Sequence, residues 1–283
     1  MAGAAEAPVG SFFDELRSAG RLRDLLMILA VPVVLLGVFS LSLEARQALA
    51  FSYTDPDIRT AFAANFVHLD VRHLGVNLAA YLLVVPTAYL LSVLSGRRDR
   101  FWFVCAFVTF LFVLPVLLSG LNLAIDRTGH VVGFSGIVMA FVGYLPVALS
   151  RYLGTYVGVG EHLDIAAVLF FAGLALIAIL GAPSTVTAAL AAVSVLAALL
   201  YLVPVLDGLE RISRRTRTLV RVPGYLEVAI ASVVLFVGLT VVAFPSDPRT
   251  AMGVVNLYAH LLGFAIGFIA AYVAVTASRH LSR

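Results

Sequence analysis

The chain has 283 residues, of which 61% are hydrophobic and only 12% are charged. A soluble domain carries roughly 25% charged residues, so this chain has too little charge to cover a globule of its size. The composition excludes a soluble enzyme and also a disordered chain, which needs low hydrophobicity and high net charge. We expect one bundle of membrane-spanning helices, because no polar stretch is long enough to fold separately.

The eight predicted spans are apolar runs long enough to cross a hydrocarbon core of about 30 Å, which takes about 20 helical residues. In chain order they are Leu25–Leu43, Leu74–Leu94, Phe101–Leu123, Phe134–Tyr152, Ile165–Ile179, Thr185–Val205, Leu226–Phe244 and Val254–Ala277. The fifth is the weakest, because only a tight turn separates it from the sixth. The fold class is therefore an all-α polytopic membrane protein with about eight transmembrane helices.

The termini are expected as tails around a single transmembrane domain, with boundaries at 1–24, 25–277 and 278–283. The segment Phe12–Leu26 is either an amphipathic helix on the membrane surface or a solvated tail. The N-terminus mixes acidic and basic residues and has no early apolar core, so it is not a cleavable signal peptide.

The arginines set the orientation, because all 19 basic residues are arginine. If the N-terminus is cytoplasmic, the inner segments hold 14 of them and the outer segments five. The positive-inside rule then places both termini in the cytoplasm. The most basic stretch, Asp207–Pro223, is interpreted as a positive-inside anchor that also contacts anionic lipid headgroups. The arginine-only, Ala/Val-rich composition suggests a prokaryotic cell-membrane protein.

Several other kinds of site are excluded by missing motifs. The net charge of +3 is small and the arginines lie in loops and tails, so nucleic-acid binding is not expected. Neither a G-x-x-x-x-G-K-[ST] loop nor a GxGxxG loop is present, so no nucleotide is expected. The single cysteine, Cys105, cannot form an internal disulfide, and no H-E-x-x-H zinc motif occurs. No cofactor or metal is implied.

Three polar residues stand out within the apolar runs. Counted from the arginine at the inner end of each span, Asn77, Ser135 and His260 all lie about 24–30 Å away along the helix. Three spans of the same direction therefore bring an amide, a hydroxyl and an imidazole to the outer half of the bilayer. Each residue alone is more often a packing or capping residue. Those ordinary roles do not predict a shared depth, so the coincidence indicates a site.

Nucleophilic acyl transfer is the chemistry that such a set supports. A serine hydroxyl becomes a nucleophile when a base takes its proton, and neutral imidazole is a suitable base near pH 7. His73, Asn77 and the backbone N–H of Ser135 can donate hydrogen bonds to an oxyanion. Gly133 and Gly136 let the chain turn sharply and approach closely at the nucleophile. No acidic residue lies at this depth, so the sequence predicts a serine–histidine dyad.

Read together, the segments His68–Asn77, Gly133–Gly136 and Ala259–Gly267 resemble the rhomboid intramembrane serine proteases. The resemblance covers roughly Leu25–Tyr152 and Val254–Ala277, and it implies a rhomboid-like helical bundle. It also implies that membrane-anchored proteins within the lipid bilayer are cleaved inside or next to a transmembrane segment.

The same resemblance implies a role for each motif residue. Ser135 would be the nucleophile and His260 the general base. His73 and Asn77 would donate side-chain hydrogen bonds to the oxyanion, and His68 would support the loop before the second span. Gly263 and Gly267 would let the helix that carries the histidine pack closely against the helix that carries the serine.

The chain also departs from the family pattern. The family has one helix between the serine and histidine helices, whereas three are predicted here, with the extra ones within 163–246. An odd number keeps the histidine helix running inward, so the site geometry is preserved. The position four after the serine, often aromatic in the family, is Met139. The first outer loop, Ala45–Arg72, lacks the Trp-Arg pair often found there.

Two other functions stay open at this stage. A rhomboid-like pseudoprotease would bind client helices without cutting them, but both catalytic residues are present here. A small-solute transporter would usually show broken helices, paired charges near the midplane and an internal repeat. No convincing repeat is visible in this chain.

Overall fold

The computed structural model describes residues 11–125, 128–157, 163–209, 222–250 and 253–280. Most of the predicted basic stretch, at 210–221, lies outside the described residues. The first ten residues of the predicted N-terminal tail and the last three of the C-terminal tail also lie outside them.

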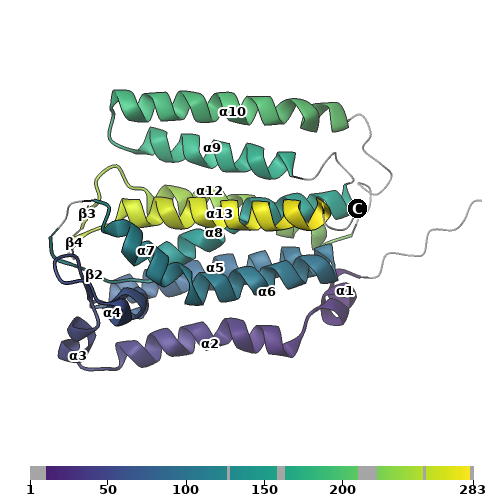
Figure 1. Cartoon of the computed structure of the whole chain (residues 1–283). Coiled ribbons are helices and arrows are strands. Elements are labelled where there is room, and N and C mark those ends of the chain that lie inside the picture. The colour runs from purple at the N-terminus through teal and green to yellow at the C-terminus, as the bar shows by residue number, and fades with distance from the viewer. Residues whose placement is uncertain (1–10, 126–127, 158–162, 210–221, 251–252, 281–283) are drawn as a thin grey trace, which may run out of the picture.

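The long helices lie side by side with their axes along one direction (Figure 1). They are α2 (Leu22–Phe39), α5 (Val71–Ser95), α6 (Arg97–Phe112), α8 (Ser135–Tyr156), α9 (Asp164–Leu180), α10 (Thr185–Leu209), α12 (Tyr225–Ala243) and α13 (Leu257–His280). The short helices are α1 (Phe12–Ala19), α3 (Leu43–Ala48), α4 (Ile58–Ala63), the 3-10 turn η1 (Ala64–Phe66) and α7 (Leu114–Asn122). Two antiparallel ribbons pair β1 (Phe51–Ser52) with β2 (His130–Val131) and β3 (Arg249–Thr250) with β4 (Gly253–Val254).

The expectation of a multi-pass helical membrane protein is confirmed by helix length and hydropathy. Among the described residues, six helices, namely α2, α5, α8, α10, α12 and α13, are long and apolar enough to cross a membrane. The pair α6 and α7 makes a seventh if it is taken as one span. The remaining predicted span corresponds to α9, an apolar helix of 17 residues that falls short of the other six.

The predicted third span is broken rather than continuous. Helices α6 and α7 meet at Val113 with a bend of 47°. Pro115 lies in the first turn of α7 and has no N–H to donate back to Leu111, which favours a kink or break at this point. The bend directs α7 toward the end of the bundle that carries the ribbons (Figure 1).

Helix α8 is the central helix, since 17 of its 22 residues are buried. It packs against α13 at very short range. A Cβ atom added at Gly143 would clash with the Phe264 carbonyl oxygen, and one added at Gly267 would clash with that of Ala140. The two backbones are therefore in direct contact, as small residues allow in membrane helices.

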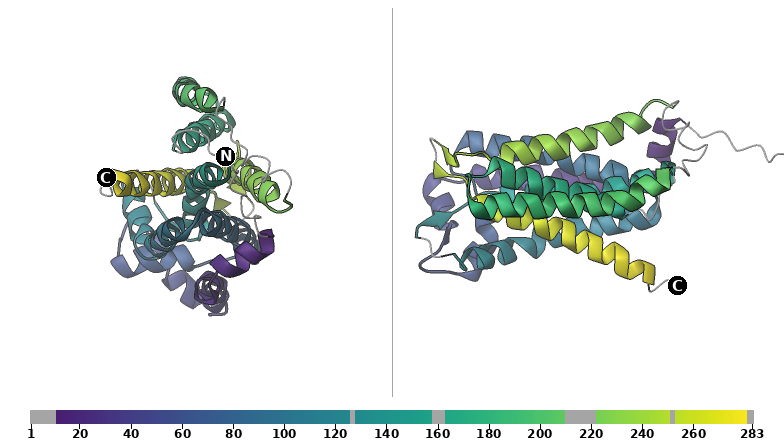
Figure 2. Two further views of the ribbon diagram at one scale, coloured as in Figure 1. Left: turned by 90° about the vertical axis from the view of Figure 1, so that its right-hand side faces the viewer. Right: turned by 90° about the horizontal axis from the view of Figure 1, so that it is seen from above.

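The helix pair α9 and α10 lies on the outside of this core (Figures 1 and 2). Helix α9 packs on α8 and α12, and α10 packs on α9. Large apolar side chains of α10, such as Val186, Val193 and Leu200, are exposed, as expected for a surface that faces lipid. The additional helices thus enlarge the bundle without separating α8 from α13.

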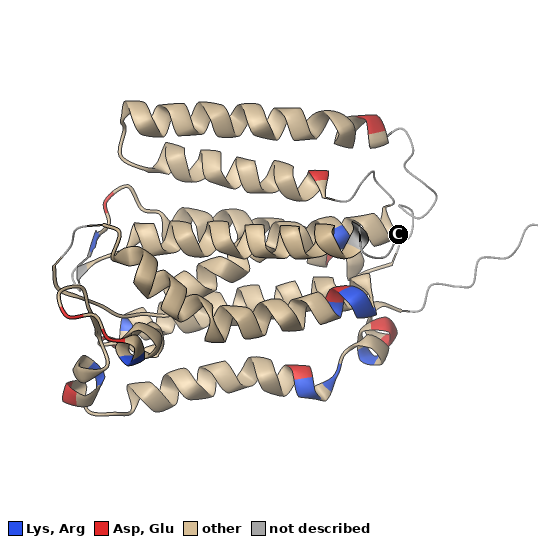
Figure 3. Ribbon diagram, in the orientation of Figure 1, with Lys and Arg blue, Asp and Glu red and all other residues tan. Residues whose placement is uncertain are grey.

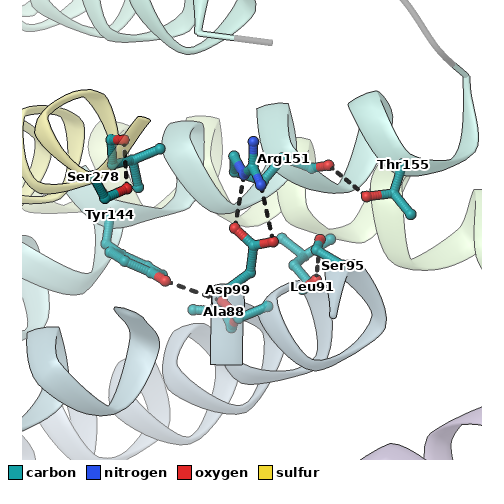
Figure 4. A network of polar contacts seen from close by, with 10 residues as sticks. Ala88, Leu91, Ser95, Asp99, Tyr144, Arg151, Thr155 and Ser278 are labelled. Carbon is teal, nitrogen blue, oxygen red and sulfur yellow. Dashed lines mark hydrogen bonds and ion pairs between the residues drawn. The ribbon is translucent and has the colours of Figure 1, made fainter. Parts of the chain in front are cut away.

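Charged residues gather at the two ends of the bundle, and the helices between these ends are almost free of them (Figure 3). At the end that the positive-inside rule assigns to the cytoplasm, Arg151 donates two hydrogen bonds to Asp99, at 2.7 and 3.1 Å (Figure 4). Arg100 likewise donates two, at 2.6 Å each, to Asp24. Asp24 was expected in a tail, but it lies buried in the first turn of α2.

The segment before the first span forms a helix that is docked on the protein. Tyr156, the last residue of α8, and Tyr225, the first residue of α12, both donate hydrogen bonds to the Glu15 carboxylate of α1. Phe12 is buried and its ring meets that of Tyr225 edge-on, with centroids 5.2 Å apart. A solvated tail is therefore not observed over Phe12–Ala19.

The contact between α8 and α13 predicts a sharp difference between two glycine variants. Gly143→Ala should lower the free energy of unfolding by about 1–3 kcal/mol, because the added methyl forces two backbones apart. Gly238→Ala, on α12 with open space around its Cβ position, should be neutral or stabilising by up to about 1 kcal/mol. Thermal unfolding in one detergent measures both variants. Equal midpoints would contradict the close contact.

Candidate functional site

A cavity of about 450 Å³ lies at the end of the bundle that carries the ribbons. Side chains from α5, α8, α12 and α13 line it, together with residues of α7 and of the ribbons. Most of the residues singled out from the sequence are among them, namely His73, Asn77, Gly133, Ser135, Gly136, Met139 and His260. His68, Gly263 and Gly267 are not among the lining residues.

Ser135 is the first residue of α8, directly after the loop that leads into this helix. Gly133, two residues before Ser135, has φ +124°, in the region that favours glycine, and its N–H donates to the Ala64 carbonyl at 2.9 Å. A Cβ at this position would also clash with the imidazole of His73. Glycine is therefore required both by the backbone turn and by the ring that packs on it.

His68 is fully buried and connects two parts of the site. Its Nε2 accepts from the backbone N–H of Phe134 at 3.4 Å and lies 2.9 Å from the Asn77 amide nitrogen. Because a backbone N–H can only donate, this Nε2 carries no proton, and the Asn77 amide must also donate to it. His68 thus holds both Asn77 and the residue before Ser135.

Charge is unfavourable at His68. Burial, with a smaller contribution from the neighbouring His73, lowers the pKa of His68 from 6.5 to about 3. The ring is therefore neutral near pH 7, as its role as a double acceptor requires. Arg46 donates to the His68 carbonyl oxygen at 2.7 Å and supports the same loop from the outer side.

Several hydrogen-bond donors converge near the Ser135 hydroxyl. The N–H groups of Ile137 and Val138 donate to the Phe134 carbonyl, whereas those of Ser135 and Gly136 begin the helix and have no partner within it. The positive end of the α8 dipole points the same way. The side chains of His73 and Asn77 line the same cavity as Ser135 and Gly136, which makes the region suited to a negatively charged oxygen.

His260 is almost completely buried in the first turn of α13. Its Nδ1 lies 2.8 Å from the carbonyl oxygen of Ala243, the last residue of α12. A carbonyl oxygen can only accept, so Nδ1 carries the proton and Nε2 keeps its lone pair. The ring of Phe244 meets the imidazole edge-on, with centroids 6.0 Å apart at 84°. The nitrogen left free is the one that a general base needs.

Ser135 and His260 share the cavity, but no hydrogen bond joins them in the part of the chain that the structure describes. Their helices are held together behind the cavity. A Cβ at Gly263 would clash with the Gly136 carbonyl, and one at Gly267 with the Ala140 carbonyl. Catalytic hydrogen bonds are often long in ligand-free enzymes and tighten when substrate binds.

Some residues at the site carry little sequence signal. Asn256 accepts a hydrogen bond from the Ala259 N–H at 3.1 Å, which caps α13, and donates to Asn122 of α7 at 2.8 Å. An asparagine directly before an apolar run is a recognisable capping signal. Asn122, Phe244 and the Ala243 carbonyl have no comparable signal, because their positions depend on contacts between helices.

Met139 lies four residues after Ser135, on the helix turn that follows the serine. It is buried and lines the cavity. The aromatic ring beside the imidazole comes instead from Phe244, at the end of α12.

Among the described residues, no group of three or more His, Cys, Asp or Glu is placed to hold a metal ion. Comparison with known proteins assigns no family, since no family model, no curated protein and no solved structure matches this chain. The interpretation of the site therefore depends on its own geometry.

The buried neutral state of His68 predicts a specific dependence of stability on pH. An unfolded histidine takes up a proton near pH 6.5, whereas folded His68 does so only near pH 3. Between these values unfolding binds a proton, so stability falls as the pH drops, by at most about 1.4 kcal/mol per pH unit. In His68→Gln, which keeps an acceptor, this component should disappear. Thermal midpoints of both proteins between pH 7 and 4 measure it, and parallel curves would contradict the prediction.

Proposed function

We propose that this chain is an intramembrane serine endopeptidase of the rhomboid type, with Ser135 as nucleophile and His260 as general base. One observation carries the proposal: a single cavity is lined by a hydroxyl at a helix N-terminus, an imidazole with a free Nε2, and several neutral hydrogen-bond donors. The Ser135–His260 pair follows the order along the chain that the sequence resemblance implies.

The reaction would begin when His260 Nε2 takes the proton of the Ser135 hydroxyl. The Ser135 oxygen then forms a bond to the carbonyl carbon of the substrate peptide, and the carbonyl π electrons move onto its oxygen. Collapse of this tetrahedral intermediate breaks the C–N bond, and His260 returns its proton to the leaving amine. A water molecule, deprotonated by the same nitrogen, attacks the acyl-enzyme and releases the carboxyl product with Ser135 restored.

An oxyanion forms both when the acyl-enzyme is made and when it is hydrolysed, and it needs hydrogen-bond donors that are already in place. The N–H groups of Ser135 and Gly136, the Asn77 amide and the His73 ring are proposed as this set. Asn77 uses one amide proton for His68, which leaves the second for the oxyanion. Removal of one such donor typically costs about 100- to 1,000-fold in rate, so each of them is open to test.

The proposed substrates are membrane-anchored proteins. The cavity lies between helices at the outer half of the bundle, and Leu239 and Val242 of α12 line one wall while Val76 and Ala80 of α5 line another. A peptide bond in a regular helix has its carbonyl engaged in a hydrogen bond, so the substrate segment must unwind before attack. Segments with helix-breaking residues near the outer membrane surface fit this requirement.

A pseudoprotease is the second candidate, and one observation favours it. The described hydrogen bonds include none between Ser135 and His260, which is the arrangement expected if the serine is never activated. The labelling experiment separates the two functions.

The protease proposal predicts that a fluorophosphonate probe labels the purified wild-type protein in detergent. Ser135→Ala should abolish labelling, because the attacking oxygen is gone. His260→Ala should slow it by about 100-fold or more, because the base is lost. Ser150→Ala is the matched control: Ser150 is a fully buried serine on the same helix, remote from the cavity, and its loss should leave labelling unchanged.

Labelled proteins are quantified by in-gel fluorescence against a rhomboid of known activity. Equal labelling of wild type and Ser135→Ala would show that the signal arises at another residue. If wild type stays unlabelled beside an active reference, the protease proposal fails and the pseudoprotease is favoured.

A further inference from the structure

We infer that the C-terminal end of α12 completes the catalytic group. Its terminal carbonyl, on Ala243, holds and polarises His260 as a carboxylate does in a serine–histidine–aspartate triad, and the Phe244 ring fixes the plane of the imidazole. This inference rests on the proposed function, and both residues are positioning residues that act through His260.

The Ala243 carbonyl is available because α12 ends there. The Phe244 N–H donates to the Thr240 carbonyl oxygen at 3.2 Å, which is the last hydrogen bond of the helix. Phe244 then leaves the helix with φ −122° and ψ 63°. The final carbonyls of a helix have no N–H partner within the helix. One of them is directed at His260 Nδ1, so a group that would otherwise be unsatisfied in a membrane is used to bind the ring.

The interaction also has an electrostatic consequence. The C-terminus of a helix carries the equivalent of about half a negative charge. When His260 takes the serine proton it becomes a cation, and this cation forms beside the negative end of α12. A triad aspartate performs the same two tasks, holding the tautomer and stabilising the imidazolium. Among the described residues, no carboxylate hydrogen-bonds to His260, so the helix end is the group placed to do this.

Phe244 restricts the rotation of the His260 imidazole about its Cβ–Cγ bond. The imidazole turns about its Cβ–Cγ bond, and a turn large enough to break the Nδ1 hydrogen bond would also redirect Nε2. The buried Phe244 ring contacts the imidazole edge-on and blocks this rotation. The adjacent residues Ala243 and Phe244 thus supply the hydrogen-bond acceptor and the side chain that restricts rotation of the imidazole.

Nothing in the immediate sequence around His260 reveals this arrangement, because Ala243 is 17 residues earlier in the chain. The position of α12 is set by contacts elsewhere on the helix. Tyr152 of α8 donates to the Tyr225 carbonyl at 2.9 Å at the far end of α12, and α12 packs along its length on α5, α8 and α9. The end of α12 therefore reaches His260 as part of an anchored helix.

The test compares Phe244→Leu, Phe244→Tyr and a matched control, Phe236→Leu. Phe236 is equally buried on α12 but lies about two turns before Phe244 and packs on Phe264, so its replacement weakens packing on α13 without removing the ring that contacts the imidazole. We expect Phe244→Leu to slow Ser135 labelling by about 10-fold or more, the scale seen when a group that orients a histidine is removed. Phe244→Tyr and Phe236→Leu should label at the wild-type rate.

A second readout does not depend on activity. Nitrogen-15 NMR of histidine-labelled protein, with the His260 signals assigned from His260→Gln, reports which ring nitrogen carries the proton. We expect the Nδ1–H tautomer in wild type and in Phe236→Leu, and a mixture of tautomers in Phe244→Leu. The thermal unfolding midpoint of each variant tests whether it is folded.

The outcomes separate this inference from the proposed function. An Nε2–H tautomer in wild type, or wild-type labelling and an unchanged tautomer in folded Phe244→Leu, would overturn the role of α12. Wild-type protein that is not labelled at all would overturn the protease proposal. In that case an Nδ1–H tautomer that is lost in Phe244→Leu would still support the contact between α12 and His260.

Discussion

Backbone contact between α8 and α13 is the constraint on which the rest of the structure depends. Gly143, Gly263 and Gly267 let the two helices approach until main-chain atoms touch, and larger side chains at these positions would clash with carbonyl groups. Apolar side chains gain little by leaving lipid for protein, so close van der Waals packing is the main source of association between such helices. The same contact holds the N-terminal turns of α8 and α13, with Ser135 and His260, on one cavity.

Around this contact, neutral hydrogen bonds do the positioning. His68 accepts from Asn77 and from the Phe134 N–H, Asn256 links α13 to α7, and the Ala243 carbonyl binds His260. A charged partner would be costly at this depth, whereas a neutral group satisfies a polar atom that would otherwise be stranded in an apolar surrounding. The buried charges that do occur, in the pairs of Asp24 and Asp99 with arginines, lie at the opposite end of the bundle.

The helices between α8 and α13 have two different roles. The pair α9 and α10 extends the bundle outward and presents apolar side chains to lipid. Helix α12 instead reaches the site, where its last turn contacts His260 and its inner side chains line the cavity. A chain can gain outer helices without disturbing a site as long as the backbone contact at its centre is retained.

The sequence alone determined that the chain is a multi-pass helical membrane protein and where most of its long helices lie, because apolar length and arginine placement are local properties. It also singled out Asn77, Ser135 and His260 through their shared depth. Only the tertiary structure decided that α6 and α7 meet in a bend at Val113, that α9 is short, and that α1, which carries Glu15, is docked on the bundle. It also decided the partners of His260. Backbone carbonyls have no sequence signature, and a ring such as Phe244 looks like any other apolar residue until helices far apart in the chain are packed together.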